Sequence, residues 1–113
     1  MTDARTEWWV RSCAAKALDG LALPYQAAAE GEEMPESMRK ALYTATNTLL
    51  SMLPAPTGYA VIGSGTPRMY RREFSTMRLA REDAEALART PDHEHVTIRA
   101  IAPDLAWNVM RVK

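Results

Sequence analysis

The sequence predicts an α+β fold in which a helical half precedes a β-rich half. Residues 1–56 repeat apolar side chains at helical spacing, whereas residues 57–113 contain short β-prone runs separated by turn residues. The chain has 113 residues, of which 47% are hydrophobic and 25% charged, a composition typical of one globular domain. We therefore expect a single domain over residues 1–113, with three helices packed with a mainly antiparallel ββαββ sheet.

The helical half is expected to contain three helices. Apolar positions over residues 10–21 form the stripe of an amphipathic helix, and Gly20 is suited to end it. Residues 24–30 begin with a proline in a first-turn position and predict a short second helix. Residues 35–53 form the clearest stripe, which Pro54 stops.

The β-rich half is expected to contain four strands and one helix. Residues 63–67 supply the turn of a hairpin, and Pro103 with Asp104 supplies the turn of another. Acidic residues in the first turns and a following Pro91 favour a helix between the hairpins. The predicted strands are 59–62, 69–79, 95–102 and 106–113, and the predicted helix is 81–90.

Composition excludes several classes of protein. Fourteen basic residues balance fourteen acidic ones, which argues against a histone-like nucleic-acid binder and against gross disorder. Apolar runs fall far short of the roughly 18 residues of a membrane span. Residues 1–5 show no basic region leading into an apolar one, so nothing marks export. Because the single cysteine, Cys13, cannot form an internal disulfide, we expect a cytoplasmic protein.

The candidate catalytic and metal-binding groups are few. Cys13 lies within an apolar helical stripe, which predicts a buried and inert thiol. His93 and His95 could share a strand face and bind one metal with Asp92 or Asp104, but a structural zinc site needs four ligands. We therefore expect a solvated loop there, with no metal, no cofactor and no catalytic residue.

The Gly63-Ser64-Gly65 segment superficially suggests a phosphate-binding loop or a nucleophilic serine. The dinucleotide fingerprint needs a third glycine where Arg68 stands, and a nucleophile elbow needs glycines two residues before and after Ser64. Because neither pattern is met, the segment predicts a hairpin turn.

Charge is balanced overall but unevenly placed. Residues 68–81 contain five arginines and one glutamate, whereas residues 30–36 contain four glutamates and no basic residue. The arginines could form a solvated face or pair with Glu30, Glu32, Glu33 and Glu36. They could also dock on an acidic protein, or bind a nucleic-acid backbone while Tyr70 and Phe74 stack on bases.

Two further features could serve a partner. Trp8 and Trp9 point about 100° apart on a helix, so Trp8 lies off the apolar stripe and is either covered by the β-rich half or available to another protein. Two hairpins also leave sheet edges that could pair with another chain or a second copy.

The segment at residues 77–87 is rich in alanine and arginine, and the chain is small. In these features it resembles small accessory proteins of bacteriophages, which bind and block host machinery or defence complexes. The resemblance implies an inhibitor of a host macromolecular complex (anti-defence, anti-CRISPR-like or host-takeover type) acting in the host cytoplasm. It transfers no functional residue.

We expect a protein that binds another protein stoichiometrically, as a monomer or homodimer, and that does not bind a membrane. The alternatives are a nucleic-acid-binding regulator that uses the same arginines, a virion structural or connector subunit, and a small enzyme around His93, His95 and Asp104. The expected contact residues are Arg68, Arg71, Arg72, Arg78, Arg81, Trp8 and Tyr70.

Overall fold

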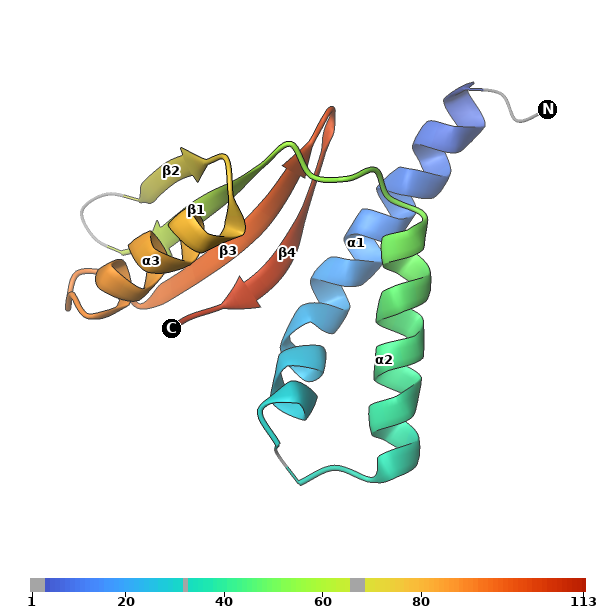
Figure 1. Cartoon of the computed structure of the whole chain (residues 1–113), viewed down its shortest axis with the longest axis horizontal. Coiled ribbons are helices and arrows are strands. Elements are labelled where there is room, and N and C mark those ends of the chain that lie inside the picture. The colour runs from blue at the N-terminus through green and yellow to red at the C-terminus, as the bar shows by residue number, and fades with distance from the viewer. Residues whose placement is uncertain (1–3, 32, 66–68) are drawn as a thin grey trace. The chain divides into compact units, whose positions relative to one another are not determined.

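The computed structural model describes residues 4–31, 33–65 and 69–113 (Figure 1). The chain divides into two compact units, Met1–Pro54 and Ala55–Lys113. Two helices belong to the first unit, and four strands and one helix to the second, which confirms the α+β class. The boundary lies two residues before the predicted change of pattern, and the packing of the units into a single domain stays a prediction.

The first unit contains α1 (Ala4–Ala29) and α2 (Glu36–Ser51). The predicted second helix is not separate, because α1 continues through Gly20 and Pro24. The prediction of three helices in this half is therefore wrong for the described residues, which form two.

A long packed face explains why α1 continues across a proline. Pro24 has no N–H to donate to the carbonyl four residues earlier, at Gly20, and its ring crowds that carbonyl. Leu18 and Ala28 are nevertheless both buried, on either side of the proline, and tertiary burial of this kind supplies most helix stability. The helix ends instead near Gly31, whose φ of 84° suits a glycine.

A ring contact and a hydrogen bond are among the contacts between the helices of the first unit. The Tyr25 and Tyr43 rings meet edge to face with centroids 5.3 Å apart. The Arg39 guanidinium of α2 donates to the Ala28 carbonyl at 2.6 Å, near the C-terminal end of α1, where carbonyls lack helical partners. The third predicted helix is confirmed as α2, which Pro35 precedes and Pro54 follows.

The second unit is an antiparallel sheet with one helix packed against it (Figure 1). The strands are β1 (Gly58–Ser64), β2 (Tyr70–Phe74), β3 (His95–Ala102) and β4 (Leu105–Arg111), in the spatial order β2-β1-β3-β4. The helix α3 (Met77–Ala88) contacts β1, β2 and β3. This arrangement agrees with the predicted ββαββ order.

The second predicted strand is shorter than expected. It ends at Phe74, and residues 77–79 belong to α3 instead. Thr76 causes the change, because its extended backbone precedes the helix and its hydroxyl accepts a hydrogen bond from the Leu79 N–H at 3.3 Å. A threonine in this position caps one of the unpaired amides of the first turn.

Thr76→Ala is expected to lower the free energy of unfolding of the second unit by about 1 kcal/mol, because it removes this cap. Ser75→Ala, one residue earlier and exposed, is the control. Chemical denaturation measures both variants. Equal stability of the two would contradict the capping role.

The core of the second unit lies between α3 and one face of the sheet. Val61, Val96 and Ile98 are fully buried, and α3 contributes Ala80 and Ala84 one turn apart. Burial alternates along the whole of β3, as expected for a strand with one packed face. The alanines lack bulk, so the helix backbone can approach the sheet closely.

Gly63 in β1 and Gly65 just after β1 leave room for the segment between α3 and β3. A Cβ on Gly63 would lie 2.8 Å from the Leu87 Cδ2 and 2.9 Å from the His93 Nδ1, and a Cβ on Gly65 would meet the Asp92 carbonyl oxygen. Both Gly63 and Ser64 belong to β1, so the prediction that they form part of a turn is wrong. Residues 66 and 67 of that turn lie outside the described part.

Candidate binding surface

The predicted arginine strand does not present a single surface. Arg72 is paired with Val61, whose side chain faces α3, whereas Arg71 is paired with Ile62 on the opposite face. Arg78 and Arg81 belong to α3 rather than to β2, and Arg68 lies outside the described residues. The four described arginines are thus distributed over two elements and both faces of the sheet.

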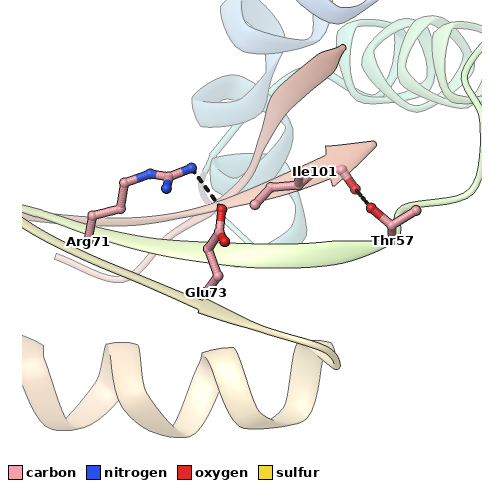
Figure 2. Close-up of polar contacts among 4 residues, drawn as sticks. All are labelled: Thr57, Arg71, Glu73 and Ile101. Carbon is pink, nitrogen blue, oxygen red and sulfur yellow. Dashed lines mark hydrogen bonds and ion pairs between the residues drawn. The ribbon is translucent and has the colours of Figure 1, made fainter. Parts of the chain in front are cut away.

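Carboxylates within the same unit neutralise three of these arginines. Arg71 is 3.0 Å from Glu73 on the face away from α3 (Figure 2), and Arg81 is 3.4 Å from Glu85 along the helix. Arg72 lies 3.9 Å from Asp83. The three acidic partners, Glu73, Asp83 and Glu85, belong to the second unit, although surface pairs of this kind contribute little stability.

Arg72 has a further neighbour. Its guanidinium carbon lies 5.3 Å from the centroid of the Phe74 ring, within the range of a cation–π contact. Arg72 and Phe74 therefore lie side by side on the edge strand β2, on the face of the sheet that α3 covers. Each of the two side chains makes a contact within the unit.

Tyr70 links the edge strand to the helix. Its hydroxyl donates to the Asp83 Oδ2 at 2.8 Å, and its half-buried ring packs against the core of the unit. Burial, then the hydrogen bond to Asp83 and the charge of that carboxylate, raise the pKa of Tyr70 above its ordinary value, and Arg72 opposes them in part. Tyr70 thus has a structural role that the sequence did not predict.

The raised pKa predicts a loss of stability at high pH. The folded state holds the phenol proton more tightly than the unfolded chain, so this stabilisation is present below about pH 10 and is lost as the pH rises through the folded pKa. We expect Tyr70→Phe to remove this part of the pH dependence, which chemical denaturation at a series of alkaline pH values measures. Tyr59→Phe leaves the Tyr70–Asp83 bond intact and is the control.

The two histidines are not brought together as a pair of ligands. His93 precedes β3, and its ring meets the Tyr70 ring at 6.0 Å with a buried Nδ1 that has no hydrogen-bond partner among the described residues. His95 begins β3, and its Nδ1 lies 2.7 Å from an Arg111 nitrogen. Within the described ranges, no three His, Cys, Asp or Glu side chains lie close enough to hold a metal ion.

Both edges of the sheet carry features that hinder pairing with another strand. Along β2, Arg71, Arg72 and Glu73 are three consecutive exposed charged residues. Along β4, the register shifts opposite Ile98 and Arg99, which is the mark of a bulge. The edges are therefore weaker candidates for a binding surface than the sequence suggested.

The N-terminal tryptophans are exposed. Trp8 is 47% exposed and Trp9 57%, and their rings meet edge to face at 5.5 Å. Trp107 in β4, by contrast, is 3% exposed. Trp8 and Trp9 are thus both exposed, whereas Trp107 is buried.

An apolar groove lies beside Trp9 in the first unit. Its volume is about 430 Å³, and its lining has no charged side chain. Small side chains on α1 leave room for it, while larger ones from both helices border it. The lining residues are Trp9, Val10, Cys13, Ala14, Ala17, Leu49 and Met52.

The prediction that the Cys13 thiol is buried is wrong. Cys13 is exposed and lines the groove. The buried residues of α1 include Ala14, Ala15 and Leu18, so the packed face is turned away from the stripe that the sequence placed around Cys13 and Ala17. One position along a helix is about 100° of rotation, which is enough to move a side chain from core to surface.

The groove residues Val10, Leu49 and Met52 were not predicted as surface residues, because they belong to apolar stripes that normally face a core. One available signal was the absence of any charged residue between Lys40 and Arg68. An uncharged helix half with apolar side chains either packs inside a protein or contacts a partner.

None of the described helices has the length and apolarity that crossing a membrane requires. Comparisons of the chain with models of protein families, with curated proteins and with solved structures found no match.

Proposed function

We propose that this chain acts by binding another protein and that the groove of the first unit is its contact surface. One observation carries the proposal: apolar side chains from α1, α2 and the C-cap residue Met52 line a shallow, open groove of about 430 Å³ that includes the exposed Trp9. Contiguous exposed apolar surface is unfavourable in water and marks interaction sites. Tryptophan is also enriched among the residues that contribute most to protein interfaces.

The chemistry of the groove defines the partner surface that fits it. Leu49 and Met52 offer aliphatic and thioether groups, and the flexible methionine adapts to the shape of a neighbour. A complementary partner presents large apolar side chains, because a charge placed there would lose its water without gaining an ion pair. Trp8, one of the predicted contact residues, is exposed next to Trp9 and extends the same surface.

Inhibition of a host complex is the more specific form of this proposal. The resemblance to phage accessory proteins supports it, and a protein that acts by covering a surface needs neither a cofactor nor a catalytic residue. Arginine contacts remain a second candidate surface. The groove is favoured because Arg71 and Arg72 lie on opposite faces of the sheet and are both paired with carboxylates.

The single thiol allows a direct test. A benzophenone maleimide attached to Cys13 places a photoreactive group inside the groove, and the sequence has no other cysteine to label. Irradiation in an extract of the cells in which the protein acts is expected to give one main adduct with another protein. Nuclease treatment before irradiation should leave the adduct unchanged, and Val10→Asp should reduce its yield at least tenfold.

The matched control moves the same probe to α3. The double variant Cys13→Ala, Arg78→Cys places it on an exposed arginine position of the second unit. An adduct from position 78 and none from Cys13 would assign binding to the arginines and overturn the groove. Loss of the adduct on nuclease treatment would favour the nucleic-acid regulator, and a linked pair of chains in the purified protein would assign the groove to self-association.

A further inference from the structure

We draw no further inference here: the strongest candidate, the apolar groove between α1 and α2, belongs to the site already described, and nothing in the structure shows which kind of segment, from a second copy or from another protein, covers it.

Discussion

Replacing Ile98 by alanine is expected to lower the free energy of unfolding of the second unit by about 2–5 kcal/mol. Ile98 is fully buried in the centre of β3, where it belongs to the same core cluster as Val61 and Ala84. Removing its side chain beyond Cβ takes away apolar burial and leaves a cavity that the neighbouring strands cannot fill. A loss of this size is a large part of the stability of an ordinary domain.

Tryptophan fluorescence can follow this unfolding selectively. Trp107 is the only tryptophan of the second unit, so a background in which Trp8 and Trp9 are replaced by phenylalanine reports on the sheet alone. Urea denaturation in this background gives the free energy. Ile101→Ala, in the same strand at a half-buried position, is the matched control and should cost less. Equal losses for the two variants would contradict the assignment of Ile98 to the centre of the core.

Gly65→Ala is expected to destabilise the second unit by about 1–3 kcal/mol or more, as overpacking does. The added Cβ would meet the backbone carbonyl oxygen of Asp92, which cannot rotate away as a flexible side chain would. The segment between α3 and β3 must therefore shift, and with it His93, which packs against Gly63. The same fluorescence background and urea series measure the effect.

Gly20→Ala is the matched control for Gly65→Ala, because it is the same substitution in open surroundings. Nothing lies within 4 Å of a Cβ at Gly20, which is inside α1. Alanine there should stabilise the first unit by roughly 0.5–1 kcal/mol, since glycine is unfavourable in a helix interior. If both substitutions changed stability in the same direction, the close approach at Gly65 would not be the cause.

Local patterns predicted most elements of the fold. The periodicity of residues 35–53 and the prolines at both ends located α2, and the predicted strand 95–102 matches β3. These features depend on neighbours within one element, so the sequence alone contains them. The end of the second strand was not predicted, because residues 69–79 were assigned to one strand and the capping role of Thr76 was missed.

The candidate site was harder to predict, because it depends on which side of a helix is covered. The stripe on α1 was visible, yet the exposure of Cys13 was not, since the buried face is centred on Ala14, Ala15 and Leu18 and not on Cys13 and Ala17. The surface formed by the arginines was hard to predict for the same reason. Their spacing suggested one basic strand, whereas pairing with β1 separated Arg71 from Arg72 and brought acidic residues to both.

By itself, the sequence determined the α+β class, the ββαββ order of the second unit and the balance of charge, because these depend on composition and on patterns within a few neighbouring residues. Only the tertiary structure decided that α1 continues past Pro24, that the Asp92 carbonyl packs closely against Gly65, and that an apolar groove lies beside Trp9. Each of these outcomes depends on the surface of an element distant in sequence, and burial against that surface outweighs the local preference of a single residue.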